Sequence, residues 1–295
     1  MRIAVAGSHG LIGSALTSAL ERHGHQVVRL VREPVTGDGQ VRWDPESFGV
    51  PPGSLTGVDA VVGLGGVNIG GRRWSGAYKQ QLRDSRVTPT QVLAEAVHTA
   101  GVPVFVSASG TSYYGDTGEV AVTEDSPAGE GFLAGLAVDW EAATAAAEDG
   151  ARVVRLRTAP VLSRQGGVLG RLRPIYRLGI GGPIGDGQQF FSWITLPDVV
   201  RAIRHVIDDT DITGPVNLSA PQQVRYGDFS DQLARRLHRR SLLKVPAAVA
   251  RAAGGELVEE LILASSRVEP KALTDNGFVF AHPTLPAALE YAHGK

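Results

Sequence analysis

A chain of 295 residues, 43% of them hydrophobic, is long enough for one large domain with a smaller lobe and a sizeable core. The net charge of -1 argues against nucleic-acid and anionic-membrane binding, and the absence of cysteine excludes a disulfide framework, a thiol nucleophile and a thiolate metal site. No apolar run approaches the roughly 18 residues of a membrane helix. Because a strand is expected at the very start of the chain, we expect no signal peptide and a cytoplasmic protein.

The first thirteen residues, MRIAVAGSHGLIG, predict a phosphate-binding turn. The apolar run at residues 3–6 reads as a buried strand, and the glycines that follow, Gly7, Gly10 and Gly13, open a helix. Such glycines let the backbone approach a pyrophosphate, and the helix N-terminus supplies free N–H groups. The spacing is G-x-x-G-x-x-G rather than G-x-G-x-x-G. An ordinary strand–turn–helix is the alternative, but the order of elements favours a dinucleotide.

Strand and helix patterns alternate through the first half of the chain. The expected strands cover residues 27–31, 59–64, 104–107 and 153–156, and the expected helices cover 79–98 and 139–148. Strands alternating with helices predict a parallel sheet covered on both faces. The fold class is therefore α/β, a Rossmann-like doubly wound sheet.

The pattern of the sequence changes after about residue 160. Residues 163–191 are rich in glycine and show no regular alternation. Strand-then-helix character returns at Trp193-Ile194 and at 198–207, and residues 228–238 and 246–264 look helical. We expect a small α+β substrate lobe over the carboxyl edge of the sheet, where doubly wound folds bind ligands.

The predicted division places a nucleotide-binding domain at residues 1–160. Residues 161–295 form most of the substrate lobe, with about 192–212 returning to the first domain. The pattern leaves the oligomeric state open, a homodimer included.

Cofactor choice depends on the end of the second strand. Enzymes that use NAD usually place an acidic residue there for the ribose hydroxyls. This chain has Arg32, whose guanidinium can pair with a 2′-phosphate, and Glu33 comes one position late. A solvated loop arginine is the alternative. The sequence favours NADP(H) over NAD(H).

Hydroxyl groups gather after the strand at 104–107. The segment VSASGTSYYG brings Ser109, Tyr113 and Tyr114 together, with Thr111 between them. Hydroxyls of this kind polarise a carbonyl or relay a proton. The alternative is a loop that uses Ser and Thr for turn hydrogen bonds. The position at a strand end favours a catalytic site.

These stretches resemble the extended short-chain dehydrogenase/reductase family, in its atypical epimerase-like branch. The similar segments run in family order: 7–13, 59–74, 84–90, 106–118, 123–143, 153–162, 178–194 and 218–221. The resemblance implies an NADP-binding Rossmann-like fold and a small-molecule substrate. It also implies cofactor contacts from the glycine turn and later segments: Gly7, His9, Gly10, Leu11, Ile12, Gly13, Arg32, Leu64, Gly65, Arg86, Thr158 and Val161, the last two by the nicotinamide.

The family's usual Tyr-x-x-x-Lys pair is missing. In that pair the lysine lowers the pKa of the tyrosine so that it acts as an acid or base near neutrality. Counted from Glu141, the two slots fall near Leu133 and Ala137, which cannot do this chemistry. The literal match at 291–295 lies at the chain's end, and we interpret it as coincidence.

Two functions remain open. The first is an NADP(H)-dependent oxidoreductase or epimerase-like enzyme acting on a small carbonyl or alcohol, in which Ser109 holds the oxygen and Tyr113 or Tyr114 handles the proton. The second is a non-catalytic NADP(H)-binding redox sensor or partner-binding module, which the missing lysine favours.

Two other patterns predict no further site. The basic run at 235–240 ends a predicted helix and is interpreted as a solvated face that complements the helix dipole, rather than a nucleic-acid site. The histidines show no metal-ligand spacing, so no metal is expected.

Overall fold

The computed structural model describes residues 1–208, 211–241 and 243–294. The chain divides into two compact units. The first comprises Met1–Ser109, Leu136–Leu156 and Val200–Val216, and the second comprises Gly110–Gly135, Arg157–Val199 and Asn217–Lys295. Among the described residues, no helix has both the length and the apolar character needed to cross a membrane.

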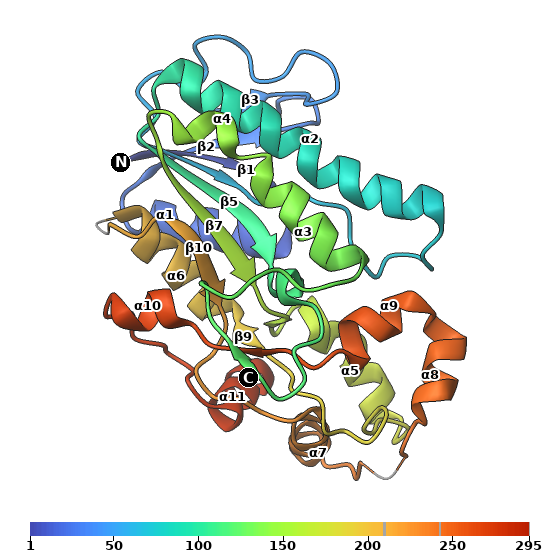
Figure 1. Cartoon of the computed structure of the whole chain (residues 1–295). Helices are drawn as coiled ribbons and strands as arrows, with labels where there is room; N and C mark the ends of the chain where they lie inside the picture. Colours follow the sequence, from blue (N-terminus) through green and yellow to red (C-terminus); the bar gives the residue numbers. More distant parts are fainter. Residues whose placement is uncertain (209–210, 242, 295) are drawn as a thin grey trace. The chain divides into compact units, whose positions relative to one another are not determined.

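The first unit is built on a sheet with the strand order β10-β7-β5-β4-β1-β2-β3 (Figure 1). Its strands are β1 Arg2–Ala6, β2 Gln26–Val31, β3 Gln40–Arg42, β4 Ala60–Gly63, β5 Val104–Gly110, β7 Arg152–Thr158 and β10 Gly214–Leu218. β1 pairs in parallel with both β2 and β4. Because the chain runs outward on either side of β1, the carboxyl ends of β1 and β4 flank a topological switch point, where such sheets bind ligands. The predicted α/β fold is confirmed.

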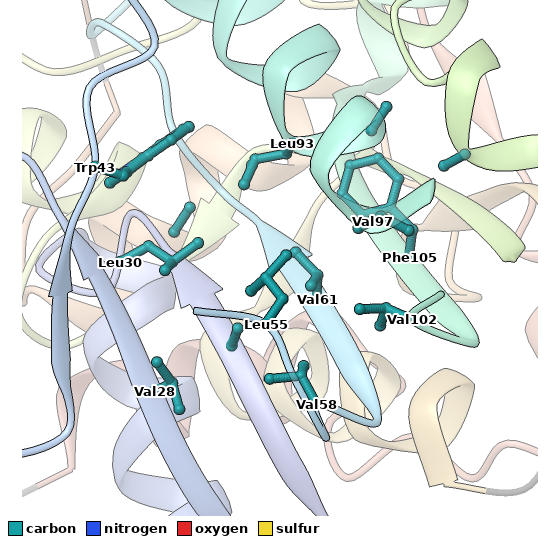
Figure 2. Close-up of a cluster of buried hydrophobic side chains, with 14 of the residues drawn as sticks. Val28, Leu30, Trp43, Leu55, Val58, Val61, Leu93, Val97, Val102 and Phe105 are labelled. Carbon is teal, nitrogen blue, oxygen red and sulfur yellow. The ribbon is translucent and has the colours of Figure 1, made fainter. Parts of the chain in front are cut away.

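A long helix, α2 (Gly76–Ala100), covers one face of this sheet. It begins at Ser75, whose hydroxyl accepts a hydrogen bond from the amide of Tyr78, and ends at Gly101 in the left-handed conformation, so it starts three residues before the predicted 79–98. Figure 2 shows Leu93 and Val97 of α2 over Val61 and Phe105 of the sheet. Leu93 and Val97 are four residues apart on α2, and Val28 and Leu30 of the same cluster alternate on β2, so one core closes between helix and sheet.

Shorter helices complete the layers around the sheet. They are α1 (Leu11–Arg22), α3 (Phe132–Ala142), α4 (Ala145–Glu148) and α6 (Leu196–Asp208). The single helix predicted at 139–148 is wrong in its bounds, because the chain is helical from 132 and breaks before 145. At the break, the hydroxyl of Thr144 donates to the carbonyl of Glu141 and accepts from Arg155. A side chain that bonds nearby backbone competes with helix continuation.

The second unit has its own core and two small parallel sheets. Its elements are the 3₁₀ turn η1 (Thr111–Tyr114), β6 (Ala121–Val122), β8 (Val161–Leu162), α5 (Gly167–Arg177), β9 (Ile194–Thr195), α7 (Tyr226–Arg236), α8 (Ala247–Gly254), α9 (Glu256–Val258), the π-helical turn η2 (Glu259–Leu263), β11 (Arg267–Val268), α10 (Lys271–Asp275) and α11 (Leu285–His293). β6 pairs with β11, and β8 pairs with β9. Buried side chains of α5, α7 and α11 form the core.

Residues 163–191 show no regular alternation in the sequence, yet α5 forms within them. Leu169, Leu172 and Tyr176 lie three or four residues apart and face the core of the second unit. Gly170 and Pro174 lie inside the same helix and conceal this period in the sequence. Burial of the apolar stripe outweighs their poor helix propensity.

The long helix predicted at 246–264 is also interrupted. Gly255 has φ of +62°, so the chain turns there between α8 and α9. The turn brings Glu260 to the start of α3, where its carboxylate accepts hydrogen bonds from the amides of Phe132 and Leu133 at 2.8 and 2.7 Å. A carboxylate at this end also complements the helix dipole.

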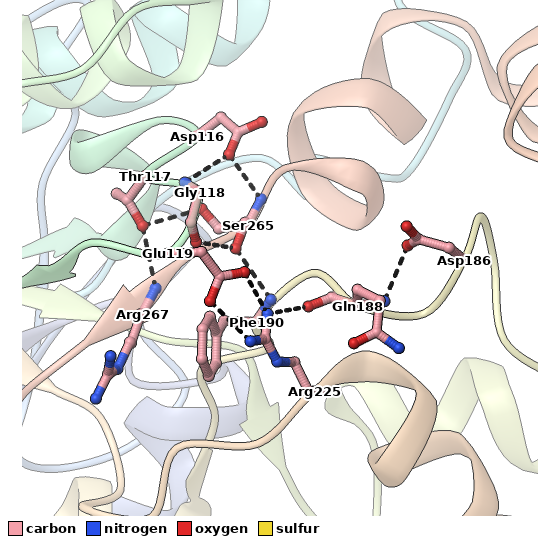
Figure 3. Close-up of polar contacts among 10 residues, drawn as sticks. All are labelled: Asp116, Thr117, Gly118, Glu119, Asp186, Gln188, Phe190, Arg225, Ser265 and Arg267. Atoms are coloured by element: carbon pink, nitrogen blue, oxygen red, sulfur yellow. Dashed lines mark hydrogen bonds and ion pairs between the residues drawn. The ribbon is translucent and has the colours of Figure 1, made fainter.

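Polar contacts fix the loop at 116–119 within the second unit (Figure 3). Glu119 forms two hydrogen bonds with the guanidinium of Arg225, both at 2.7 Å, and Arg225 stacks on the ring of Phe190. The hydroxyl of Ser265 donates to the carbonyl of Gly118, and its amide donates to Asp116. This loop is therefore held by side chains from two separate chain segments, those of Arg225 and Ser265.

Candidate functional site

A cavity of about 610 Å³ opens in the first unit at the carboxyl ends of β1, β2 and β4. This volume is in the usual range for small-molecule and cofactor sites. Its lining combines the first glycine turn with later segments of the same unit: Ala6, Gly7, Ser8, His9, Gly10, Leu30, Val31, Arg32, Glu33, Pro34, Thr36, Gln40, Trp43, Gly63, Gly65, Gly66, Val67, Ser85, Pro89, Thr90 and Leu93. The cavity occupies the switch point of the sheet, as expected for a doubly wound fold.

The glycine turn forms the floor of this cavity. Gly7 has φ of +80°, and a β-carbon there would lie 2.9 Å from the carbonyl carbon of Leu64. A β-carbon on Gly13 would lie 2.1 Å from the carbonyl oxygen of Gly7. Only glycine therefore fits at both positions. The amide of Gly10 donates to Gly7, and α1 begins directly afterwards with Leu11, Ile12 and Gly13 in its first turn.

Ser8 belongs to the same turn and was not predicted. Its side chain is 4% exposed and lines the cavity. Its hydroxyl has no hydrogen-bond partner among the described residues. A buried hydroxyl without a partner costs free energy, and a phosphate oxygen in the cavity would satisfy it. Its place between Gly7 and Gly10 was the available indication in the sequence.

Arg32 directly follows β2, is exposed and lines the cavity, and its contact with a 2′-phosphate stays a prediction. Within the residues that the structure describes, no acidic side chain pairs with its guanidinium. Gln40 and the buried Trp43, at and just after β3, line the same region and were not predicted. Nothing near them in the sequence points to a ligand, because only the pairing of β3 with β2 brings them there.

Arg86 is buried behind the cavity wall. Its guanidinium donates to the carbonyl of Val67 at 2.9 Å and to that of Leu82 at 3.0 Å, and lies 5.2 Å from the ring centre of Trp140. Burial lowers the pKa of Arg86 to about 10, which still leaves it charged at neutrality. It supports Val67, a lining residue, and its predicted contact with a cofactor stays a prediction.

Ser109 lies at the end of β5, on the same sheet edge as the cavity. β5 pairs with β4 so that Ser107 is opposite Gly63, a lining residue. The hydroxyl of Ser109 is buried and donates to a carboxylate oxygen of Glu141 at 2.7 Å. The hydroxyl hydrogen of Ser109 is therefore engaged by Glu141, and the oxygen is free only to accept. To donate a hydrogen bond to a substrate oxygen, the hydroxyl has to break its bond to Glu141.

The two predicted tyrosines lie in η1 of the second unit and differ in environment. Tyr114 is buried, donates to Asn217 at 2.7 Å and accepts from Arg157 at 2.9 Å. Burial raises the pKa of Tyr114 to about 12, against the opposing effect of these hydrogen bonds. Tyr113 is half-buried, and the guanidinium carbon of Arg157 lies 3.4 Å from its ring centre. Tyr113 is thus the more accessible phenol.

Replacement of Tyr114 by phenylalanine is expected to lower the free energy of unfolding by about 1–3 kcal/mol, because it leaves Asn217 and Arg157 without their shared hydroxyl. Because the pKa of Tyr114 is higher in the folded protein than in the unfolded chain, the neutral phenol stabilises the fold. This contribution to the free energy of unfolding is complete below the unfolded pKa of 10 and is lost as the pH rises through about 12. Urea unfolding between these pH values measures both effects. A variant as stable and as alkali-sensitive as the wild type would contradict this network.

The remaining predicted positions are also located. Leu133 and Ala137, at the slots of the missing pair, are both 2% exposed on α3. Thr158 and Val161 end β7 and begin β8, in the second unit. Tyr291 lies on α11, and Lys295 lies outside the described residues. No group of three or more metal-ligating side chains occurs in the described part of the chain.

Comparisons with known proteins assign the family. Residues 3–218 match the NAD dependent epimerase/dehydratase family, and residues 245–292 match a domain of unknown function, DUF1731. The chain is 49% identical over 291 residues to epimerase family protein MT2273 of Mycobacterium tuberculosis, covering 98% of this chain and 97% of that protein. It is 35% identical over 295 residues to human epimerase family protein SDR39U1, covering 98% and 99% of the two chains.

Solved structures agree with this assignment. The structure of human SDR39U1 (isoform 2) with NADPH has a TM-score of 0.91 at 35% identity and covers all of both chains. A nucleoside-diphosphate sugar epimerase from Corynebacterium glutamicum has a TM-score of 0.83 at 35% identity, and the match covers all of this chain but 58% of that one. The chain belongs to the NAD dependent epimerase/dehydratase family, and the resemblance inferred from its motifs is confirmed.

Proposed function

We propose that this protein is an NADPH-dependent oxidoreductase or epimerase-like enzyme that binds its cofactor in the cavity of the first unit. The observation that carries the proposal is the glycine turn, whose Gly7 and Gly13 exclude any side chain while Ser8 offers an unpaired buried hydroxyl. The NADPH in the human relative's structure supports the choice of cofactor. Titration of the protein with NADPH and NADH, followed by nucleotide fluorescence, tests it directly, since equal affinities would count against the role of Arg32.

Each part of the cofactor has residues suited to it. The amides at the start of α1 and the hydroxyl of Ser8 suit the pyrophosphate, because a helix N-terminus stabilises anionic oxygens. Arg32 suits the 2′-phosphate, which a guanidinium binds with charge-assisted hydrogen bonds. Thr158 and Val161 are assigned to the nicotinamide by family resemblance.

When bound, the nicotinamide supplies hydride transfer to or from a carbonyl or alcohol carbon. We assign the proton to the phenol of Tyr113, because Tyr114 is buried and already shared by Asn217 and Arg157. Ser109 orients the substrate oxygen once its hydroxyl leaves Glu141. Nucleoside-diphosphate sugars join simple aldehydes and ketones as candidate substrates, since the Corynebacterium relative is described as an epimerase of that class.

Loss of the two hydroxyls is expected to lower turnover without affecting cofactor binding. For a substrate found by following NADPH oxidation over a carbonyl and nucleotide-sugar panel, Tyr113→Phe is expected to lower kcat about 100-fold, in the usual range for a general acid. Ser109→Ala is expected to lower it by about 10-fold, as for one hydrogen bond. Unchanged turnover in the double variant, with wild-type NADPH affinity, would remove both residues from the mechanism.

A second function is favoured by the two buried apolar residues, Leu133 and Ala137, at the slots of the missing pair. In this alternative the protein binds NADP(H) and does not turn over a substrate, so it reports the redox state or docks a partner. This alternative would be favoured over an enzymatic function if freshly purified wild-type protein bound NADPH tightly and no member of the substrate panel led to oxidation of NADPH.

A further inference from the structure

The fold joins the basic run at 235–240 to the end of another helix in the second unit. Tyr176 of α5 donates to Ser230 of α7 at 2.7 Å, so these helices pack together. Beyond α7 the chain turns sharply at His238, which has φ of +55°. The turn returns Arg239 to the end of α5, where its guanidinium donates to the carbonyl of Arg177 at 3.0 Å.

A basic–apolar surface results, defined here by Arg177, Leu178, Ile180, Arg236, Arg239 and Arg240. All six side chains are exposed, and Leu178 and Ile180 are 75% and 53% exposed. Within the described residues, no carboxylate pairs with any of the four guanidinium groups. Burial lowers the pKa of His293 first, and the charges of Arg173, Arg236 and Arg177 lower it further, so two arginines of this surface act on the same histidine.

The composition of this surface is unusual for the chain. The whole protein has a net charge of -1, whereas this surface carries only positive charges and large aliphatic groups. The two aliphatic residues flank Gly179, which has φ of +75°, so they stand on a turn that follows α5. Leu178 and Ile180 therefore lie next to arginines on one turn, and exposed aliphatic groups beside positive charges suit an anionic, amphipathic surface.

We propose that the basic–apolar surface docks the protein on an anionic phospholipid membrane. Arginines bind headgroup phosphates, and Leu178 and Ile180 enter the boundary between headgroups and acyl chains. Aliphatic side chains favour a lipid surface over a nucleic acid, whose bases stack on aromatic rings. This docking is peripheral and adds a partner that neither the family assignment nor the proposed chemistry contains.

Vesicle co-sedimentation tests the proposal with the full-length protein. The wild type is expected to bind vesicles of equal parts phosphatidylglycerol and phosphatidylcholine at low salt, and not vesicles of phosphatidylcholine alone. Arg177→Gln/Arg236→Gln/Arg240→Gln is expected to weaken binding about 100-fold, from about fivefold per basic residue at an anionic surface. Leu178→Ser/Ile180→Ser is also expected to weaken vesicle binding. Its effect is expected to persist at high salt, where the apolar contribution to binding remains.

Matched variants separate docking from general charge and exposure effects. Arg22→Gln/Arg42→Gln/Arg83→Gln removes the same charge from the first unit, and Val120→Ser/Val279→Ser removes two other exposed aliphatic side chains, 66% and 72% exposed. Both are expected to bind vesicles as the wild type does, and all variants to keep wild-type NADPH affinity. The proposal would be overturned if the test and control variants lost the same vesicle affinity, or if the wild type did not bind vesicles at all. It would also be overturned if the wild type bound duplex DNA or polyglutamate in a parallel binding assay but not vesicles.

Discussion

Gly13→Ala is expected to abolish NADPH binding, with a loss of at least about 100-fold in affinity, as when several charge-assisted contacts fail together. The new β-carbon would lie 2.1 Å from the carbonyl oxygen of Gly7 and 2.9 Å from the α-carbon of Ser8. Both are backbone atoms, so relief requires the turn itself to open. The amides and the hydroxyl of Ser8 then no longer converge on one anion. Fluorescence titration with NADPH measures the effect, and urea unfolding shows whether the fold persists.

Gly135→Ala provides the control for this change. Gly135 lies inside α3, and a β-carbon added there would meet no atom within 4 Å beyond its chain neighbours and the backbone of its own helix. This variant is expected to bind NADPH as the wild type does and to gain about 0.5–1 kcal/mol of stability, since alanine favours a helix over glycine. Wild-type NADPH affinity in folded Gly13→Ala would show that the pyrophosphate does not bind at this turn.

Arg32→Gln is expected to weaken NADPH binding about 10- to 100-fold and to leave NADH binding nearly unchanged. The two nucleotides differ only in the 2′-phosphate, and a hydrogen bond to a charged group contributes about 1.5–3 kcal/mol. Arg32 lines the cavity at the end of β2, where this phosphate is expected, and is exposed. Its substitution therefore has little effect on stability. Parallel titrations with the two nucleotides measure the change in preference.

The salt dependence of binding gives an independent check on Arg32. NADPH affinity of the wild type is expected to fall more steeply with salt than that of Arg32→Gln, because one exposed ion pair is lost. Arg22→Gln, which removes an exposed arginine at the end of α1, controls for net charge and is expected to match the wild type. Equal losses for NADPH and NADH would assign Arg32 a structural role instead.

Local pattern predicted most strands of the sheet in the first unit, but it missed β3, β10 and the break between α3 and α4. The strands that became β1, β2, β4 and β5 are short apolar runs bounded by glycine or polar residues, and burial in a parallel sheet needs little else. Prediction failed where packing outweighed propensity. Gly170 and Pro174 concealed α5, and the helical composition of 246–264 concealed the turn at Gly255.

The residues of the candidate site also fall into two groups, those that local sequence predicted and those that only tertiary contacts bring to the site. Gly7 and Arg32 were predicted because each directly follows a strand, and Gly13 because it completes the spacing of the glycine turn. Trp43 was missed because it reaches the cavity only through the pairing of β3 with β2. The partners of Ser109 and Tyr114 were also missed, since Glu141 and Asn217 are 32 and 103 residues away along the chain.

The sequence alone determined the fold class, the glycine turn and the charge at the end of β2, because these depend on residue type and short-range order. Only the tertiary structure decided what each functional side chain contacts. It left the hydroxyl of Ser8 buried without a partner among the described residues, committed that of Ser109 to Glu141, and buried Tyr114 while leaving Tyr113 accessible. It also joined the basic run to Leu178 and Ile180. Such contacts follow from the closing of long loops, which no local pattern encodes.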